Sequence, residues 1–469
     1  MPDQVDLAIL GGGNAGYACA LRAAQLGLAV TLVERDKVGG TCLHRGCIPT
    51  KALLHSAELT EHIRSAGAVG VLVGEPSVDW GKVSSFKDSV VTKLYKGLQH
   101  LMKGRKVRVV EGSGRVTGPG TIEVEGGEPV TARNLVLASG SYARGLPFLE
   151  PDGKAFITSD HALTLGDIPT SAIVIGAGAV GLEFASIYRS FGAEVTVIEA
   201  LDRLAPGEDE DVSAEFTREF SKRGIRCLSR VKVTAGETDN GSARVTFEKD
   251  GKSETVTADR CLLAVGRGPV SEGLGYQEIG VRIERGFVVT DEWCRTGVER
   301  VWAIGDLITQ PELGLPFPHF QLAHVAFAEG IHVAEQIAGK DTAPVDYVGV
   351  PRCTYSFPEI ASVGLTERQA KDAGHDVSVA RFPWSASGKA SILGENAGFV
   401  KVVAAKDSKV LGIHMIGPRV TELIAEAQLV TNWEAYPEEV AALVHPHPTL
   451  SEALGETMLA LAGKKLHAG

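Results

Sequence analysis

The 469-residue sequence has no long uninterrupted apolar run and no cluster of basic residues. Its formal net charge of −11 is the opposite of the basic balance that nucleic-acid binding requires. The apolar stretch at residues 5–10 is too short for a signal peptide and lacks a basic flank, and no later run reaches membrane-spanning length. We therefore expect a soluble cytoplasmic protein with neither a membrane nor a nucleic acid as its partner.

Cysteine is also scarce, and its seven positions do not form the framework of a secreted disulfide-rich protein. We expect five of the seven to be small buried apolar residues: Cys19, Cys227, Cys261, Cys294 and Cys353. Hydrophobic residues make up 44% of the chain, which is ample for several cores, and the length suggests about three domains.

The remaining two cysteines, Cys42 and Cys47, lie five positions apart in a stretch of glycines and a proline, residues 39–51. On a straight helix their Cα atoms would be about 8.6 Å apart, beyond the roughly 4.4–6.8 Å that a disulfide spans. A bond therefore needs a bent backbone, for which Gly46 gives freedom, while Pro49 suits the start of a helix carrying Lys51.

A redox pair is the interpretation that this spacing favours, and Lys51 or a helix N-terminus would promote the thiolate. Two unpaired thiols or half of a zinc site are the alternatives. No second cysteine pair or matching histidines lie nearby, and we predict no metal site.

A dinucleotide-binding fingerprint opens the chain. A predicted strand at residues 5–10 leads into Gly11, Gly13 and Gly16, followed by a helix at 17–26, a strand at 29–33 and Glu34. The glycines permit a tight turn, close approach of a pyrophosphate to the helix N-terminus, and close helix–strand packing, and Glu34 lies where a carboxylate would bind a ribose.

The same unit recurs further along the chain. A strand at 172–175 precedes Gly176, Gly178 and Gly181, and a helix and the strand 194–198 lead to Glu199. Two nucleotide sites are therefore predicted, although two Rossmann-type layers with empty sites would show the same pattern. A carboxylate at Glu199 would repel a 2′-phosphate, so the second site should prefer NAD over NADP.

The rest of the chain supplies connecting elements and a third type of domain. Residues 225–265 alternate like strands, and residues 301–306 form an apolar strand that ends on Asp306, which could be a turn residue, a helix cap or a ligand to a hydroxyl. A proline-rich loop at 308–320 precedes a helix at 321–337, and from residue 345 strands and helices follow without a nucleotide fingerprint.

A second chemical signal lies near the C-terminus. His445 and His447 stand in an extended run bounded by prolines, and Glu452 could orient an imidazole. Taken locally, the pattern from Thr449 to Glu452 is more typical of a capping box for the last helix, expected at 454–461.

Together these motifs resemble the flavoprotein disulfide reductases of the glutathione reductase type, from end to end of the chain. The resemblance rests on residues 39–51, the segment 176–183, residues 265–267 and 303–306, residues 322–324, and His447 with Glu452. It implies an α/β fold with two Rossmann-type three-layer nucleotide-binding domains plus an α+β dimerisation domain. The boundaries expected are 1–147 for the FAD-binding domain, 148–269 for the NAD-binding domain, 270–343 for a central domain completing the FAD site, and 344–469 for the dimerisation (interface) domain.

The resemblance also implies a role for each matching residue. Cys42 would meet the substrate, Cys47 would contact the flavin, and His447, oriented by Glu452, would be the acid–base catalyst. The residues implied in FAD binding are Gly11, Gly13, Gly16, Glu34, Gly40, Thr41, Lys51, Asp306, Leu322 and Ala323. Those implied in NAD binding are Gly176, Gly178, Gly181, Glu199 and Gly266, with Glu183 pairing with Lys51 near the flavin.

The implied activity is FAD-dependent oxidation of a protein-bound dihydrolipoyl group, with NAD as hydride acceptor, by a homodimer that shares its active sites. Because the chain enters its first strand at Val5, we expect the lipoyl group to be carried by a separate protein of a 2-oxo acid dehydrogenase or glycine-cleavage complex. The alternatives are another pyridine-nucleotide-linked disulfide reductase, or a catalytically idle subunit that binds FAD and NAD.

Three positions depart from the family's pattern. Ser139 stands where threonine is usual, Pro446 stands where alanine is common, and the segment 308–320 looks longer than usual. We expect an insertion with a local role near the flavin.

Overall fold

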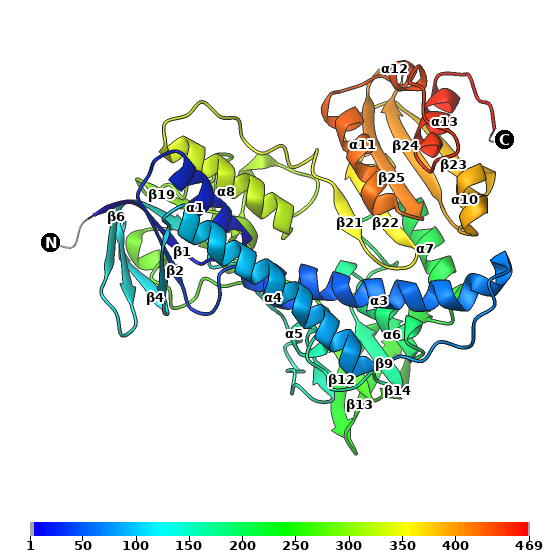
Figure 1. Ribbon diagram of the computed structural model, residues 1–469, viewed down its shortest axis with the longest axis horizontal. Coiled ribbons are helices and arrows are strands. Elements are labelled where there is room, and N and C mark those ends of the chain that lie inside the picture. The colour runs from blue at the N-terminus through cyan, green and yellow to red at the C-terminus, as the bar shows by residue number, and fades with distance from the viewer. Residues whose placement is uncertain (1–3, 407, 468–469) are drawn as a thin grey trace. The chain divides into compact units, whose positions relative to one another are not determined.

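The computed structural model describes residues 4–406 and 408–467, and the chain forms two compact units (Figure 1). The first unit contains Met1–Ala52, Ser84–Arg144 and Arg267–Tyr347, and the second contains Leu53–Val83, Gly145–Gly266 and Val348–Gly469. Each unit is therefore assembled from three separate stretches of sequence.

A parallel sheet in the order β3-β2-β1-β6-β19 is the centre of the first unit. Its strands are β1 (Val5–Leu10), β2 (Val30–Glu34), β3 (Arg108–Glu111), β6 (Val130–Leu137) and β19 (Val301–Ala303). Leu7, Ile9 and Val136 are fully buried in it, which explains why these strands read as apolar runs rather than as alternating ones.

Helices and small sheets complete the first unit. Helix α1 (Asn14–Gln25) packs against α8 (Ala323–Ile337), and a Cβ at Gly330 would lie 2.5 Å from the Ala15 carbonyl oxygen, so the two helices approach closely at this glycine (Figure 1). The small strands are β4 (Gly114–Gly118), β5 (Thr121–Val124), β7 (Ser141–Ala143), β16 (Arg267–Pro269), β17 (Ile283–Glu284), β18 (Phe287–Val289) and β20 (Ile308–Thr309).

The second unit contains a parallel sheet in the order β11-β10-β9-β15-β8. Its elements are β8 (Phe156–Ile157), α5 (Ser159–Ala162), β9 (Ser171–Ile175), α6 (Ala179–Ser190), β10 (Glu194–Ile198), α7 (Glu210–Lys222), β11 (Arg226–Leu228) and β15 (Arg260–Leu263). An antiparallel sheet of β12 (Lys232–Asp239), β13 (Ser242–Lys249) and β14 (Lys252–Ala258) is inserted between β11 and β15.

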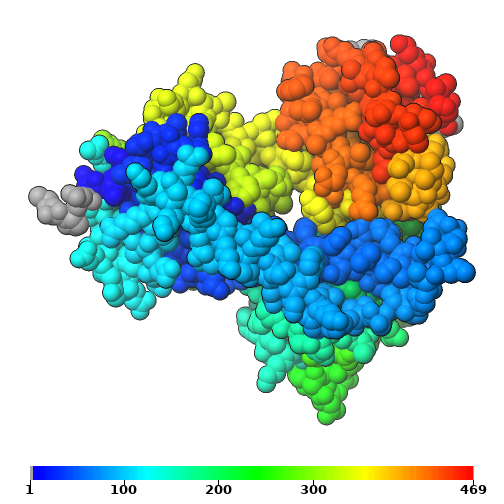
Figure 2. All heavy atoms as spheres, viewed as in Figure 1, coloured from blue at the N-terminus to red at the C-terminus, as the bar shows by residue number. Residues whose placement is uncertain are grey.

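An antiparallel sheet in the order β21-β22-β25-β24-β23 and a group of helices form the C-terminal part of the same unit. The strands are β21 (Arg352–Thr354), β22 (Glu359–Gly364), β23 (Val377–Pro383), β24 (Phe399–Ala405) and β25 (Val410–Gly417). The helices are α9 (Glu367–Asp372), α10 (Gly388–Leu393), α11 (Val420–Asn432), α12 (Pro437–Ala441) and α13 (Glu452–Leu461). In the space-filling view the orange and red C-terminal segment forms one continuous body (Figure 2).

The redox stretch belongs to α2 (Gly40–Arg45) and the start of α3 (Cys47–Ser65), and α4 (Trp80–Gly104) follows. Short 3-10 helices occupy Ala66–Val69, Gln277–Ile279, Gly305–Leu307, Pro311–Leu313 and Trp384–Ala386.

Several predicted elements are confirmed, with shifted ends. Helix α1 begins at Asn14, three residues before the predicted start, because the helix opens directly from the glycine loop with Gly13 as its N-cap. Helix α13 begins at Glu452 rather than at residue 454. The expected α/β class, with two Rossmann-type layers and a separate α+β part, is confirmed.

Within the described ranges, no helix combines the length and apolar character needed to cross a membrane.

Candidate active site and nucleotide-binding sites

The first glycine loop joins β1 to α1, and each of its three glycines is required for a different reason. Gly11 has φ +106°, and a Cβ there would lie 2.2 Å from the Ala138 carbonyl oxygen. A Cβ at Gly16 would lie 1.9 Å from the Gly11 carbonyl oxygen. Gly13 has nothing within 4 Å of its Cβ position, so the missing side chain leaves open space at the helix N-terminus. Open space at that point is what a pyrophosphate needs.

The second glycine loop, between β9 and α6, repeats this geometry. Gly176 has φ +103°, a Cβ at Gly181 would lie 2.0 Å from the Gly176 carbonyl oxygen, and the Cβ position of Gly178 is open. Gly266, with φ +102° and an open Cβ position, follows the neighbouring strand β15. Because the same spatial pattern recurs, the second loop can hold a second dinucleotide.

A carboxylate at the end of the second strand faces each loop. Glu34 accepts the Gly12 N–H at 2.6 Å and the Asp36 N–H at 2.9 Å. Glu199 accepts the Ala177 N–H at 2.7 Å and the Leu201 N–H at 2.8 Å. These bonds hold both acids beside the glycine loops, where a ribose hydroxyl can donate to a remaining carboxylate lone pair.

The backbone bends between Cys42 and Cys47 and brings their side chains together. Cys42 lies in α2, Cys47 is the first residue of α3, and Gly46 separates the two helices. A Cβ at Gly46 would lie 3.0 Å from the Thr41 carbonyl oxygen and 3.3 Å from the Cα of Cys42, so a larger residue would open the bend. The chain therefore has the bent backbone that a disulfide between Cys42 and Cys47 requires and that a straight helix does not provide.

The two thiols are hydrogen-bonded to each other. The hydrogen bond with Cys47 raises the pKa of Cys42 well above its usual range, burial adds to this, and Asn14 and Lys51 act in the opposite direction. Burial, with a smaller contribution from the charges of the nearby Cys42 and Cys47, raises the pKa of Tyr17 to about 12. The sequence motifs do not single out Asn14 and Tyr17, although both stand in the first turn of α1.

The redox stretch packs onto the first glycine loop within the same unit. The Gly39 N–H donates to the Gly12 carbonyl at 2.8 Å, and a Cβ at Gly40 would lie 2.7 Å from the Cα of Gly13. Gly40 therefore adjoins the open space at Gly13, and Thr41 is the next residue of α2. An FAD whose pyrophosphate occupied that space would meet the residues that carry Cys42, so the residues present fit this cofactor.

Asp306 lies at the carboxyl end of the same parallel sheet, in the turn after β19. The Ser141 hydroxyl donates to its carboxylate, and Arg267 Nε lies 3.7 Å from the same oxygen. Burial raises the pKa of Asp306, while Ser141 and Arg267 act in the opposite direction. Leu322 is the N-cap and Ala323 the first residue of α8, and Gln321 donates to the Asp306 carbonyl at 3.1 Å.

His447 and Glu452 are in contact in the second unit. Glu452 Oε1 lies 2.8 Å from His447 Nδ1, and Glu452 Oε2 accepts the Thr449 N–H at 2.7 Å. The predicted capping box is only half formed, because the Thr449 hydroxyl donates to the Pro446 carbonyl and the N-cap of α13 is Ser451. The Glu452 carboxylate therefore binds the His447 imidazole with one oxygen and the Thr449 N–H, in the turn before α13, with the other.

Other predicted contacts join residues of different units and stay predictions. Lys51 belongs to the first unit and Glu183 to the second, and the cysteines and His447 are divided in the same way. Within its own unit, Glu183 is buried and accepts the Tyr355 N–H at 3.0 Å. Among the described residues, no group of three or more His, Cys, Asp or Glu side chains is arranged to hold a metal ion.

Family models match most of the chain. The model described as pyridine nucleotide-disulphide oxidoreductase matches residues 5–330, and the model for the dimerisation domain of the same proteins matches residues 350–458.

Several relatives that match this chain over all or nearly all of its length are dihydrolipoyl dehydrogenases. A dihydrolipoyl dehydrogenase of Bacillus subtilis is 45% identical, and one of Zymomonas mobilis is 41% identical, each covering 100% of this chain and of the relative. An archaeal relative from Haloarcula marismortui, dihydrolipoyl dehydrogenase 2, is 38% identical over 98% of both chains.

Solved structures share the fold over nearly the whole chain. The crystal structure of LpdA from Mycobacterium tuberculosis has a TM-score of 0.88 at 26% identity and covers 97% of this chain and 99% of its own. The HOCl-induced flavoprotein disulfide reductase RclA from Escherichia coli has a TM-score of 0.84 at 24% identity, with the same coverage, and shows likeness of fold alone.

Proposed function

Because this chain belongs to the pyridine nucleotide-disulphide oxidoreductase family, we propose that it oxidises a protein-bound dihydrolipoyl group to the lipoyl disulfide, with FAD as cofactor and NAD as electron acceptor. It is an NAD-dependent flavoprotein oxidoreductase that acts on a sulfur group. The observation that carries this conclusion is the thiol contact between Cys42 and Cys47 beside the first glycine loop.

Thiol–disulfide exchange begins the reaction. A thiolate of the dihydrolipoyl group attacks Cys42 in the Cys42–Cys47 disulfide, forms a mixed disulfide and releases Cys47 as thiolate. The second substrate sulfur then attacks the substrate sulfur of that mixed disulfide, closes the lipoyl ring and releases Cys42. The substrate has lost two electrons, and the cysteine pair has gained them. Bound FAD supplies the acceptor for these two electrons, and bound NAD supplies the final acceptor.

His447 is the residue that we assign to proton transfer. With Glu452 held against Nδ1, the Nε2 atom is left to accept a substrate thiol proton. The assignment is supported by an imidazole that is 78% exposed and tethered at one nitrogen.

The cofactor residues follow the geometry of the loops. We assign Gly11, Gly13, Gly16 and Glu34 to the ADP half of FAD, and Asp306 to its ribityl chain. Gly176, Gly178, Gly181, Glu199 and Gly266 are assigned to NAD. The pairing of Lys51 with Glu183 near the flavin is part of the same proposal.

The assembly that we propose is a homodimer in the cytoplasm. The match of residues 350–458 to a dimerisation domain supports a dimer, and a shared active site would bring His447 of one subunit to the cysteines of the other. The domain boundaries at residues 147, 269 and 343 belong to this proposal. The substrate carrier would be the lipoyl-bearing protein of a 2-oxo acid dehydrogenase or glycine-cleavage complex.

A comparison of two substrate classes tests the function. Purified flavin-loaded protein should reduce NAD with dihydrolipoamide as donor and should not reduce glutathione-type disulfides with NADPH. The reverse result would identify another disulfide reductase. Failure in both directions, with bound flavin present, would identify an idle nucleotide-binding subunit.

A further inference from the structure

His445, which the proposed mechanism does not use, is anchored between two helices. Its Nε2 atom lies 2.7 Å from Glu426 Oε1 on α11, and its side chain is 13% exposed, whereas that of His447 is 78% exposed. The chain therefore presents one exposed and one anchored imidazole two residues apart, each paired with a different carboxylate.

A glycine in α13 makes room for the His445 ring. A Cβ at Gly455 would lie 2.7 Å from His445 Nδ1 and 2.8 Å from Cε1. Glycine inside a helix costs roughly 0.5–1 kcal/mol relative to alanine, so a mid-helix glycine calls for a packing reason. Here the reason is the imidazole, which lies directly against the helix backbone one turn after Glu452.

The carboxylate of Glu452 interacts electrostatically with both imidazoles, those of His445 and His447. The carboxylates that face His445 are Glu426 from α11 and Glu452 from α13. The hydrogen bond with Glu426 is the main cause that raises the pKa of His445, so the protonated ring is more stable here than in a free imidazole. Burial would raise the pKa of Glu452, but the hydrogen bonds from Thr449 and His447 and the charges of His447 and His445 outweigh it, and the pKa is lowered.

We propose that His445, hydrogen-bonded to Glu426 and packed against Gly455, is a positioning residue for the Glu452–His447 couple. It fixes the loop that carries His447 against α11 and α13, and its charge when protonated adds to the hydrogen bonds that lower the pKa of Glu452. An ionised Glu452 accepts the Nδ1–H of His447 and leaves Nε2 free to take a proton. The inference rests on the proposed function, since it assigns a task to His445 through the acid–base role of His447.

The test compares H445Q and E426Q with the wild type as flavin-loaded enzymes. Removing the positive charge of His445 makes protonation of Glu452, and with it loss of the bond that orients His447, easier, so the acid limb of kcat/KM for dihydrolipoamide should move to higher pH. The half-reaction with dihydrolipoamide should slow by up to about 10²-fold, the loss that a misplacement of about 1 Å produces. The half-reaction with NADH, which needs neither imidazole, should keep its wild-type rate.

Two further variants make the test specific. G455A should reproduce the slowing, because the new methyl group occupies the place of the ring. H467Q is the matched control: His467 pairs with Glu456 on the same helix at 2.7 Å, and its loss should change neither half-reaction nor the pH profile.

The outcomes separate this inference from the proposed function. An active wild type whose acid limb and dihydrolipoamide half-reaction are unchanged in both H445Q and E426Q would overturn the positioning role alone. E426Q keeps the shape of the side chain, so it decides the question if H445Q yields no flavin-loaded protein. A wild type that fails to oxidise dihydrolipoamide would overturn the proposed function instead.

Discussion

Glu452 Oε1 lies 2.8 Å from His447 Nδ1, while the other oxygen of the same carboxylate holds the Thr449 N–H. The local sequence around Glu452 allows two interpretations, a residue that caps the last helix and a residue that orients an imidazole. The structure shows that Glu452 makes a contact of each kind. Glu452 also fixes which imidazole nitrogen is available, because the bond at Nδ1 directs the reactive lone pair to Nε2.

Replacing His447 with glutamine should slow dihydrolipoamide oxidation by roughly 10²–10⁴, the usual contribution of general acid–base catalysis. Steady-state NADH formation measures the loss. The flavin absorbance should stay unchanged, because His447 is exposed and supports no core. Turnover within a few-fold of wild type would remove His447 from the acid–base role.

Replacing Gly178 with alanine should weaken NAD binding without disturbing the fold. The new methyl group meets nothing within 4 Å and takes space that we assign to the pyrophosphate. KM for NAD should rise by about tenfold or more, equivalent to about 1.4 kcal/mol. Flavin content and the dihydrolipoamide half-reaction should stay as in the wild type.

Alanine at Gly181 is the contrasting variant in the same loop. Its Cβ would lie 2.0 Å from the Gly176 carbonyl oxygen, so helix and loop cannot keep their positions. We expect loss of folded protein, measured as soluble yield and thermal unfolding. If G178A and G181A behaved alike, the distinction between open and closed glycine positions would be wrong.

Glu329 should make the stability of the first unit depend on pH. It is fully buried, accepts the Gly305 N–H at 2.6 Å and the Tyr347 hydroxyl at 2.9 Å, and burial raises its pKa to about 8. A carboxyl with a raised folded-state pKa contributes stability that is full below its usual value of 4.5 and is lost as the pH rises through about 8.

E329Q should therefore flatten the loss of stability between pH 6 and pH 9. The amide keeps a polar partner for Gly305 and Tyr347 but cannot ionise. Thermal unfolding at both pH values measures the effect, at about 2–4 °C per kcal/mol for a domain of about 150–250 residues. An equally steep fall in both proteins would contradict the assignment.

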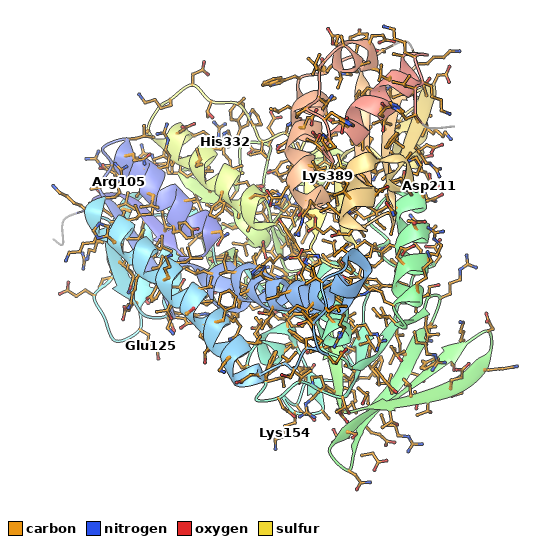
Figure 3. All side chains as sticks on the ribbon, turned by 45° about the vertical axis from the view of Figure 1, so that its right-hand side comes forward. Arg105, Glu125, Lys154, Asp211, His332 and Lys389 are labelled. Carbon is orange, nitrogen blue, oxygen red and sulfur yellow. The ribbon has the colours of Figure 1, made fainter. Side chains whose placement is uncertain are left out.

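Lys401 holds a buried ionic cluster at the N-terminus of α7. Its Nζ lies 2.8 Å from Asp209, 2.5 Å from Asp211 and 2.8 Å from Glu367, and the Lys401 side chain is 1% exposed. Asp211 marks this helix end in Figure 3. Methionine at position 401 leaves Asp209 buried without its cation, which should cost about 3–5 kcal/mol of unfolding free energy.

Chemical denaturation measures that cost, and a surface pair provides the control. Lys409 pairs with Glu434 where both side chains are exposed, so K409M should change stability by no more than about 0.5 kcal/mol. If K401M and K409M lowered the free energy of unfolding equally, the buried cluster would contribute no more to stability than the surface pair.

The sequence predicts best those features that depend on residues close together in the chain. Gly11, Gly13 and Gly16 indicate their loop by their spacing, and Cys42 and Cys47 indicate a bend in the same way. The close contact that requires glycine at position 11 comes from the Ala138 carbonyl, far along the chain, and is not visible in the local sequence. Helix α1 begins earlier than the sequence predicts, because Gly16, a residue type that disfavours helix, lies within its first turn.

The surroundings of Asp306 could not be predicted in this way. Ser141 and Arg267 reach its carboxylate from strands β7 and β16, which lie far from it in sequence and pair only in the folded unit. Similarly, nothing in the residues next to His445 reveals that Gly455 gives space to its ring.

Thiol counting tests the central claim most directly, because the whole account requires Cys42 and Cys47 to cycle between disulfide and dithiol beside the flavin. Oxidised, flavin-loaded protein is titrated anaerobically with NADH, and accessible thiols are counted before and after. The account predicts two additional thiols per subunit in the wild type and none in C42S or C47S. An unchanged thiol count in the wild type would contradict it.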